Sequence, residues 1–337
     1  MKKLKQTKLR LWVISVALFL AALLVIVVVF RNKKPVSILI IGDSISAGAG
    51  ASSSEYKWFK RLPGVIKDLS NVKVEIENDS LGGNDTYSAY CRIMRKPDDS
   101  TYNIILICSG ANDGSSLGLY YENLLWGISN KYPEAAVFCI LQSSEKENPE
   151  KVAVIQELAD YYGAYTIDMI EAFEESEYPY NNLSIDGVHP NDLGQDIYLS
   201  KIGETLSNYL ENGKVLAMPI KQVSSPINQE INSWGDYSFY SLEDMKKIND
   251  FEYELIIPKS RIIIGYDYIS FEGNNYFEVS SKDTVLFNKD INQDNDVEME
   301  FNNLENINCE VEETITVLFS SEEMKNHFLG LNITKCK

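Results

Sequence analysis

The chain has 337 residues, 45% hydrophobic and 11% aromatic, which is enough for one large or two ordinary globular domains and excludes a disordered or fibrous protein. Its formal net charge is −18, and because the first 34 residues carry eight basic and no acidic side chains, the remainder has a charge of −26. A negative field of that size repels phosphate backbones and argues against nucleic acid as a partner.

Residues 11–30 form an uncharged apolar segment, LWVISVALFLAALLVIVVVF. Its length is about what a helix needs to cross a bilayer, so we expect a transmembrane anchor, with residues 1–34 as basic tail plus anchor. Five basic residues precede the segment and three follow it, which predicts a cytoplasmic N-terminus and places the chain from Pro35 onward outside the cell membrane. The alternative is a cleaved signal peptide, whose apolar core usually has about 7–15 residues and ends at small residues. This segment ends VVVFRNKK, which favours an uncleaved anchor.

Residues 35–213 alternate β-rich segments with segments of helical periodicity. The expected strands are VSILIIG, VKVEIEN, YNIILIC, AAVFCIL and AYTIDMI. Their near-continuous apolarity is typical of parallel strands that are covered on both faces. The expected helices are EYKWFKRLPGVIKDLS, LGLYYENLLWGISNKY, PEKVAVIQELADYYG and NDLGQDIYLSKIGETLSNYLENG. This pattern predicts an α/β fold, a doubly wound flavodoxin-like parallel sheet of five strands with helices on both faces.

Residues 214–337 are rich in aromatic and β-branched residues and in Asn, Asp and Gly turns. We expect a linker at KQVSSPINQE, followed by a smaller all-β domain of the sandwich type. Cys309 and Cys336 are candidates for a disulfide bond, which the sequence leaves open. The segment DINQDNDVE resembles a calcium loop, but Asn295 and Phe301 stand where the loop needs glycine and glutamate, so we interpret it as a polar turn.

Ligands of parallel α/β sheets bind beyond the carboxyl ends of the strands, so the loops there are examined first for chemistry. Four of these loops are informative: GDSIS after the first strand, NDSLGGNDT after the second, SGAND after the third, and DGVHP before the last helix. Together they offer a hydroxyl group, flexible glycine amides, a carboxamide, and an imidazole near a carboxylate.

These four blocks, in this order across roughly residues 36–210, resemble the signature blocks of the SGNH (GDSL-type) hydrolase family. The matching residues are the nucleophile Ser44, the glycine Gly83 with Gly82 beside it, Asn112, Asp186 and His189. The resemblance implies the SGNH hydrolase fold and the hydrolysis of carboxylic esters without a cofactor or a metal.

The residue types also suit acyl transfer on chemical grounds, because the reaction needs a nucleophile, a base, an orienting carboxylate and donors for the oxyanion. The chain has two histidines, and since His327 lies in the expected β domain, His189 is the candidate base. The short step from Asp186 through a glycine lets the carboxylate fold back onto this imidazole and fix its tautomer. The N–H groups of Ser44 and Gly83 and the side-chain amide of Asn112 are the candidate oxyanion-hole donors.

Three other patterns have simpler explanations. GSSLG at residues 114–118 fits the nucleophile elbow of α/β-hydrolases with Ser116 as nucleophile, but the apolar strand ends near Cys108 and we expect GSSLG to begin the next helix. We interpret Asp168 as a helix cap. The tyrosines of YYENLLW and ADYYG have the spacing of a helix face that packs on the sheet, so we expect them in the core.

The sequence therefore predicts a membrane-anchored extracellular serine esterase that works through an acyl-Ser44 intermediate. The anchor and the added β domain favour O-acetyl esters of cell-envelope polysaccharide as the substrate. Three alternatives remain: an O-acyltransferase with the same site, a lysophospholipase or thioesterase, and a non-catalytic surface protein that binds glycans. The oligomeric state is left open.

Overall fold

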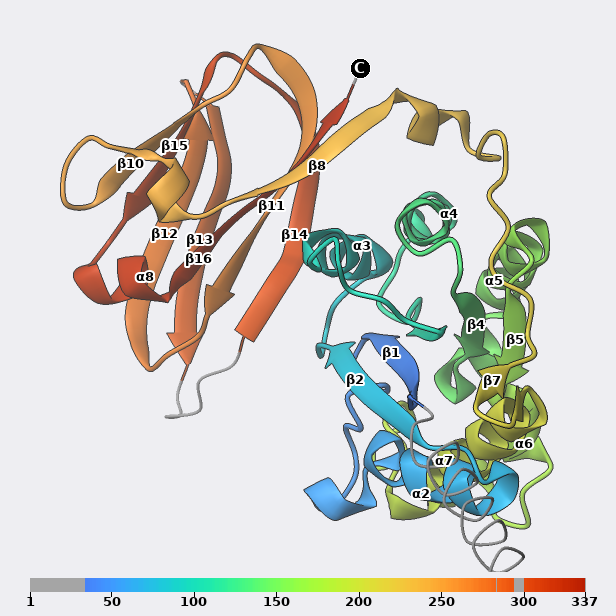
Figure 1. Cartoon of the computed structure of the whole chain (residues 1–337). Helices are drawn as coiled ribbons and strands as arrows, with labels where there is room; N and C mark the ends of the chain where they lie inside the picture. Colours follow the sequence, from blue (N-terminus) through green and yellow to red (C-terminus); the bar gives the residue numbers. More distant parts are fainter. Residues whose placement is uncertain (1–33, 283, 294–299, 337) are drawn as a thin grey trace, which may run out of the picture.

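The computed structural model describes residues 34–282, 284–293 and 300–336 (Figure 1). The expected transmembrane segment, residues 11–30, lies outside the described residues, as do residues 294–298 of the DINQDNDVE segment. Within the described ranges, no helix has both the length and the apolar character required to cross a bilayer.

A parallel five-stranded sheet with the strand order β2-β1-β3-β4-β5 forms the N-terminal domain. Its strands are β1 (Val36–Gly42), β2 (Val74–Ser80), β3 (Ile104–Cys108), β4 (Ala136–Leu141) and β5 (Tyr165–Asp168). The order reverses direction after β1, so the helices that follow lie on opposite faces of the sheet. The predicted parallel α/β sheet is thus confirmed.

Helices cover both faces of this sheet (Figure 1). They are α2 (Trp58–Ser70), α3 (Thr86–Arg95), α4 (Leu117–Lys131), α5 (Pro149–Tyr162), α6 (Met169–Glu174) and α7 (Asp192–Asn208). Side chains of α2, α6 and α7 share one core with Ile38 and Ile40, whereas those of α3, α4 and α5 share a second core with Leu39 and Ile41. Because successive residues of β1 enter different cores, the strand is continuously apolar from Ile38 to Ile41.

Two antiparallel sheets form the C-terminal domain and enclose a core of their own. One sheet has the order β13-β12-β15-β10-β9, and the other has the order β14-β11-β16-β8. The strands are β8 (Trp234–Tyr240), β9 (Lys246–Lys247), β10 (Glu252–Ile256), β11 (Ser260–Ile269), β12 (Gly273–Ser281), β13 (Thr284–Gln293), β14 (Glu300–Val311), β15 (Thr314–Phe319) and β16 (Phe328–Cys336), with α8 (Glu322–His327) before the last. The predicted all-β domain is confirmed.

The central strands β11 and β16 of the β14-β11-β16-β8 sheet are buried on both faces because the sheet packs between its own domain and the N-terminal domain. Ile262 and Ile264 of β11 enter the β-domain core, and Ile263 between them enters the core formed by α3 and α4. Figure 1 shows β14 beside α3. At this contact Arg95 of α3 forms an ion pair with the fully buried Asp267, with Nη1 2.7 Å from Oδ2. The two domains therefore share a specific, partly charged interface.

The connection between the domains is held against the surface of the first. The hairpin of β6 (Leu210–Glu211) and β7 (Lys214–Val215) turns at Asn212 and Gly213, both with positive φ, and spans the predicted boundary between residues 213 and 214. Further along, the buried Glu122 of α4 accepts hydrogen bonds from the backbone N–H groups of Ile227 and Asn228. The expected linker is thus fixed in its second half.

The cysteines are free thiols. Cys309 lies on β14 and Cys336 on β16, and these strands flank β11 on opposite sides. Two strand spacings separate them by about 10 Å, which is beyond the reach of a disulfide bond. Their side chains also pack into different cores, so this candidate disulfide does not form.

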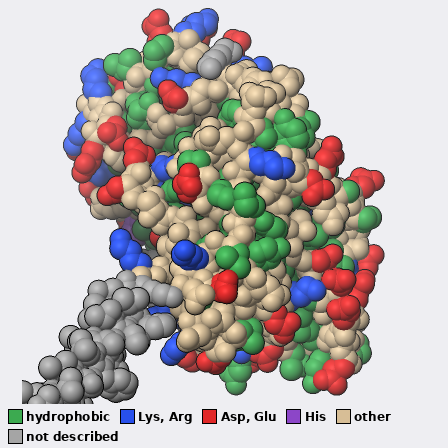
Figure 2. All heavy atoms as spheres, turned by 45° about the vertical axis from the view of Figure 1, so that its right-hand side comes forward, with side chains coloured by type: hydrophobic (Ala, Val, Ile, Leu, Met, Phe, Trp, Pro, Cys, Tyr) green, Lys and Arg blue, Asp and Glu red, His purple; other side chains and the backbone are tan. Residues whose placement is uncertain are grey.

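Acidic side chains gather along one edge of the molecule in the space-filling view, whereas lysine and arginine side chains are scattered (Figure 2). This distribution agrees with the net charge of −18.

Candidate active site

Ser44 lies in the turn that follows β1, at the carboxyl edge of the sheet. A Cβ on Gly42 would lie 2.0 Å from the carbonyl oxygen of Cys108, so only glycine fits where the strand enters the turn. The next residue, Asp43, is fully buried and accepts a hydrogen bond from the N–H of Ile45 at 2.9 Å. Asp43 thus fixes the turn from its buried side, and Ser44 lies half-buried at the surface.

Ser44, His189 and Asp186 form a continuous series of hydrogen bonds. The Oγ atom of Ser44 lies 2.9 Å from Nε2 of His189, and Nδ1 of His189 lies 2.7 Å from Oδ2 of Asp186. The other oxygen of Asp186 accepts the N–H groups of His189 and Val188. These bonds, led by the backbone N–H of His189, lower the pKa of Asp186 to about 2. With Nδ1–H directed to the carboxylate, Nε2 is free to accept the proton of Ser44.

The loop that carries His189 is held against the loop that follows Ser44. Gln195 of α7 is fully buried, and its side-chain amide donates to the carbonyl oxygens of Ala49 and Pro190 at 3.2 and 3.0 Å. Gly50 has a φ of +89°, and a Cβ there would lie 2.4 Å from the carbonyl oxygen of Pro190. The glycine at position 50, after Ser44, therefore permits the close approach of the histidine loop.

Candidate donors for an oxyanion lie on the first, second and third loops. A Cβ on Gly82 would be 3.7 Å from the Cβ of Ser44, and the next residue, Gly83, has a φ of +75°. In the described part of the chain, the N–H groups of Ser44 and Gly83 donate to no protein atom. The exposed carboxamide of Asn112 donates one hydrogen to the carbonyl oxygen of Asn84 at 2.9 Å, which leaves its second hydrogen for a ligand.

A buried arginine, which the sequence reasoning missed, connects these loops. Arg92 of α3 donates to the side-chain oxygen of Asn84 at 2.8 Å and to the carbonyl oxygen of Gly42 at 2.9 Å. Asn84 in turn donates to the carbonyl oxygen of Gly82. Burial lowers the pKa of Arg92. The sequence signal that could have identified Arg92 is its charge, which stands out within the largely apolar segment SAYCRIM.

The other sequence candidates lie outside this arrangement. Ser116 occupies the N-cap position of α4, as expected, and Asp168 caps α6 by accepting the N–H of Glu171. Tyr121 and Tyr162 are fully buried, as expected for core residues. The core prediction is wrong for Tyr161, which is 38% exposed, and for Tyr120, which lines a cavity between the domains.

This interdomain cavity has a volume of about 490 Å³. The α/β domain and the β domain both line it, through Asp85, Asn112, Asp113, Gly114, Ser116 and Tyr120 from the first and Leu286, Phe287, Asn306 and Ile307 from the second. Because Asn112 belongs to its wall, the cavity opens beside the candidate oxyanion hole.

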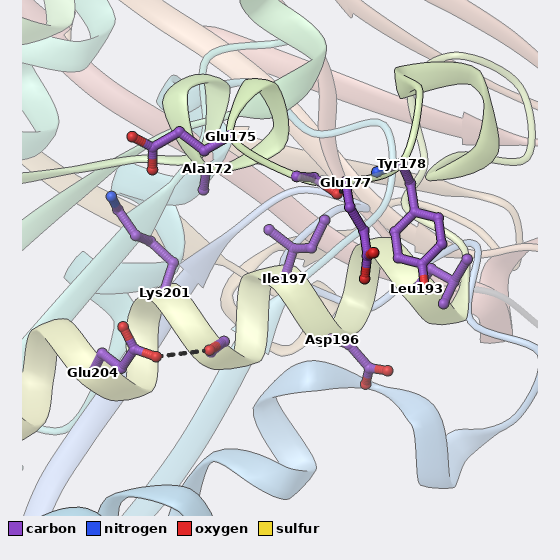
Figure 3. Close-up of a pocket in the computed structure, with 11 residues that line it drawn as sticks. Ala172, Glu175, Glu177, Tyr178, Leu193, Asp196, Ile197, Lys201 and Glu204 are labelled. Atoms are coloured by element: carbon purple, nitrogen blue, oxygen red, sulfur yellow. Dashed lines mark hydrogen bonds between the residues drawn. The ribbon is translucent and has the colours of Figure 1, made fainter.

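A second hollow of about 470 Å³ lies along α7 and contains none of the candidate site residues (Figure 3). Ile197, Lys201 and Glu204 of α7 face it from one side, and Glu175 and Tyr178 line it from the segment that begins at the end of α6. In this hollow Oγ of Ser200 donates to Glu204 at 2.9 Å. The residues that line the hollow include no histidine that could serve as the base for a serine.

A parallel α/β sheet that carries a hydrogen-bonded serine, histidine and carboxylate at its carboxyl edge is the arrangement of a serine hydrolase. Residues 40–197 match the model of the GDSL-like Lipase/Acylhydrolase family. The protein is an ester-bond hydrolase, and its α/β domain is similar to this family over those residues.

Two comparisons with known proteins extend this result. The thioesterase 1/protease 1/lysophospholipase L1 of Escherichia coli K12 is 24% identical over 186 residues, which cover 50% of this chain and 82% of that protein. A two-domain esterase (CEX) active on acetylated mannans, co-crystallized with mannopentaose, superposes with a TM-score of 0.67 at 14% identity and covers 94% of this chain and 95% of its own. At that identity the similarity shows a shared fold, which extends over both domains.

Proposed function

We propose that the protein is a membrane-anchored extracellular serine esterase that removes O-acetyl groups from cell-envelope polysaccharide through an acyl-Ser44 intermediate. The observation that carries the proposal is the series of hydrogen bonds from Ser44 through His189 to Asp186, at 2.9 and 2.7 Å.

In this mechanism His189 removes the proton of Ser44 as Oγ attacks the ester carbonyl, and Asp186 stabilises the imidazolium that forms. The N–H groups of Ser44 and Gly83 and the side-chain amide of Asn112 stabilise the oxyanion. The imidazolium then protonates the leaving alcohol. In the second half-reaction, His189 activates a water molecule that releases the acyl group from Ser44.

The proposed location rests on the sequence. The apolar residues 11–30 would anchor the chain, and the excess of basic residues before them would keep the N-terminus in the cytoplasm. Both domains would then face the cell envelope, where acylated polysaccharide is accessible.

The proposed glycan substrate is supported by the chemistry of the interdomain cavity. The hydroxyl of Tyr120 donates to the side-chain oxygen of Asn306 at 2.8 Å, and the amide of Asn306 lies 3.3 Å from Oδ2 of Asp85. Carboxylates, carboxamides and a phenol beside the apolar Leu286 and Phe287 match the hydroxyl groups and the apolar faces of a sugar chain. The two-domain neighbour that acts on acetylated mannans agrees with such a substrate.

A second candidate substrate is a longer acyl ester, as in a lysophospholipase or thioesterase. Ile185 and Val188 flank Asp186, and they are 63% and 41% exposed. Two exposed apolar side chains beside the catalytic loop could contact an acyl chain, and the E. coli relative carries these activities in its name.

The purified full-length chain should release free acetate from O-acetylated oligosaccharides, and p-nitrophenyl acetate should be hydrolysed faster than the longer-chain p-nitrophenyl esters. Asn306→Ala and Tyr120→Phe should raise KM for the oligosaccharide and leave p-nitrophenyl acetate hydrolysis unchanged. A preference for long chains would favour the second candidate. Transfer of the acetyl group to an added glycan, rather than to water, would indicate the O-acyltransferase alternative.

A further inference from the structure

Gln142 is a buried glutamine that directly follows β4, at the carboxyl edge of the sheet. Gln142 is 2% exposed. In the strand order β1-β3-β4, its side chain reaches across the end of β3, where Nε2 lies 3.4 Å from the carbonyl oxygen of Cys108. It is thereby in position to contact the loops after both β1 and β3.

The two ends of this carboxamide contact the two loops that carry the proposed chemistry. Nε2 donates to both carboxylate oxygens of Asp43, at 3.0 and 2.8 Å. Oε1 accepts the N–H of Ala111 at 3.2 Å. Asp43 directly precedes Ser44, and Ala111 directly precedes Asn112. Only this orientation of the amide satisfies a carboxylate at one end and an N–H donor at the other.

We infer that Gln142 is a positioning residue that couples the nucleophile loop to the oxyanion loop, so that Ser44 and Asn112 face the same carbonyl group. The inference rests on the proposed function, since it assigns a partner to the residues proposed to attack and stabilise. A shift of about 1 Å between these groups can cost about 100-fold in rate. A rigid buried bond on each side limits such a shift.

Gln142 also influences the charge of Asp43. Burial raises the pKa of Asp43 to about 6, and the bonds from Gln142 and from the N–H of Ile45 oppose this rise. The other titratable groups that act on Asp43 are His189, the Cys108 thiol and the Tyr198 phenol. The ionised carboxylate is the form that accepts from both Gln142 and Ile45, so the same amide that positions the turn favours its bonded state.

Two substitutions separate positioning from simple stabilisation. Gln142→Met keeps the length of the side chain and removes both contacts. Gln142→Glu keeps an acceptor for the N–H of Ala111 but sets a carboxylate against Asp43, and the two can hydrogen bond only when they share a proton. Glu122→Met is the matched control, because it also removes the polar end of a fully buried side chain and affects the linker rather than the site.

For p-nitrophenyl acetate, we expect Gln142→Met to lower kcat about 10- to 100-fold with KM changed less than about twofold. Glu122→Met should lower the thermal midpoint and keep kcat. The ratio of kcat for Gln142→Glu to that for the native enzyme should rise as the pH falls from about 8 to about 6, because the shared proton restores the bond.

The inference is overturned if Gln142→Met keeps native kcat, if Glu122→Met loses as much kcat as Gln142→Met for a similar drop in thermal midpoint, or if the Gln142→Glu ratio does not change with pH. Should Gln142→Met fail to fold, the pH dependence of Gln142→Glu decides. Failure of the proposed function is a separate result, seen as unchanged hydrolysis in Ser44→Ala.

Discussion

Ser44 and His189 are 145 positions apart in the chain, yet Oγ of one lies 2.9 Å from Nε2 of the other. They come together because the loop after β1 and the loop before α7 lie side by side at the carboxyl edge of the sheet. Buried side-chain amides hold both loops, since Gln142 bonds to the residue before Ser44 and Gln195 bonds to the residue after His189. The pair is thus positioned by the residues beneath it.

Gly50→Ala should disturb the histidine loop, because the new Cβ would lie 2.4 Å from the carbonyl oxygen of Pro190 and the φ of +89° disfavours alanine. We expect kcat to fall about 10- to 100-fold as the base moves away from the nucleophile. Gly64→Ala is the control, since nothing lies within 4 Å of its Cβ, and within α2 it should stabilise the fold by about 0.5–1 kcal/mol. Native kcat in Gly50→Ala would contradict this account of the loop.

Asn112→Ala removes a proposed oxyanion donor and should lower kcat by about 10²–10³ with little change in KM. Asn130→Ala is a matched control, because the amide of Asn130 also donates to a backbone carbonyl, that of Trp126 at 2.8 Å, but lies on α4 away from the site. Steady-state kinetics with p-nitrophenyl acetate compare the two variants. Equal activity in both would remove Asn112 from the oxyanion hole.

The protein should become more stable as the pH falls from about 8 to about 5.5, owing to two buried carboxyl groups. Burial raises the pKa of Asp43 to about 6 and that of Asp113 to about 7, so the folded state binds protons more tightly than the unfolded state. The stability from these groups is fully present below about pH 4 and is lost as the pH rises through 6 and 7.

Between these pH values, the raised pKa of Asp113 should change the free energy of unfolding by about 2 kcal/mol and that of Asp43 by about 1 kcal/mol. Urea denaturation of Asp113→Asn should show a smaller pH dependence than the native chain. Asp250→Asn is the control, because the pKa of this exposed carboxyl is lowered and it stays ionised throughout the range. An unchanged pH dependence in Asp113→Asn would contradict the assignment.

Arg95→Ala should destabilise the interface between the domains, because it removes the ion pair with the buried Asp267 and the stacking of the guanidinium over Phe239 at 4.5 Å. We expect a loss of about 3 kcal/mol in the free energy of unfolding, measured by urea denaturation. Lys246→Ala, which breaks an exposed pair with Glu254, should change stability by less than about 0.5 kcal/mol. A loss of unfolding free energy in Arg95→Ala as small as that in Lys246→Ala would show that the Arg95 contact adds no stability.

The parallel sheet and the β domain could be predicted because the residues of each strand indicate by themselves whether one or both of its faces are buried. Strands buried on both faces have continuous apolar runs, as in β3 and in residues Ile38–Ile41 of β1. The candidate site residues could also be located, because a parallel sheet brings its carboxyl ends to one edge. Whether Ser44, Gly83, Asn112, Asp186 and His189 act as proposed is a question for kinetics.

Other features could not be predicted because they depend on contacts between distant segments. Helix α3 was missed, since its buried Thr86, Ser88 and Arg92 interrupt the apolar period with side chains that bond to other loops. Helix α6 has only six residues, too few for a periodic signal. Tyr120 has the spacing of a core residue, and only the docking of the β domain places it in a cavity.

The most direct test of the central claim compares Ser44→Ala with Ser116→Ala in the purified full-length chain, by p-nitrophenyl acetate hydrolysis and by labelling with a fluorophosphonate. We expect Ser44→Ala to lose hydrolysis and labelling, and Ser116→Ala to keep most of both, since Ser44 is the serine hydrogen bonded to His189. Hydrolysis and labelling that survive in Ser44→Ala and disappear in Ser116→Ala would contradict the account.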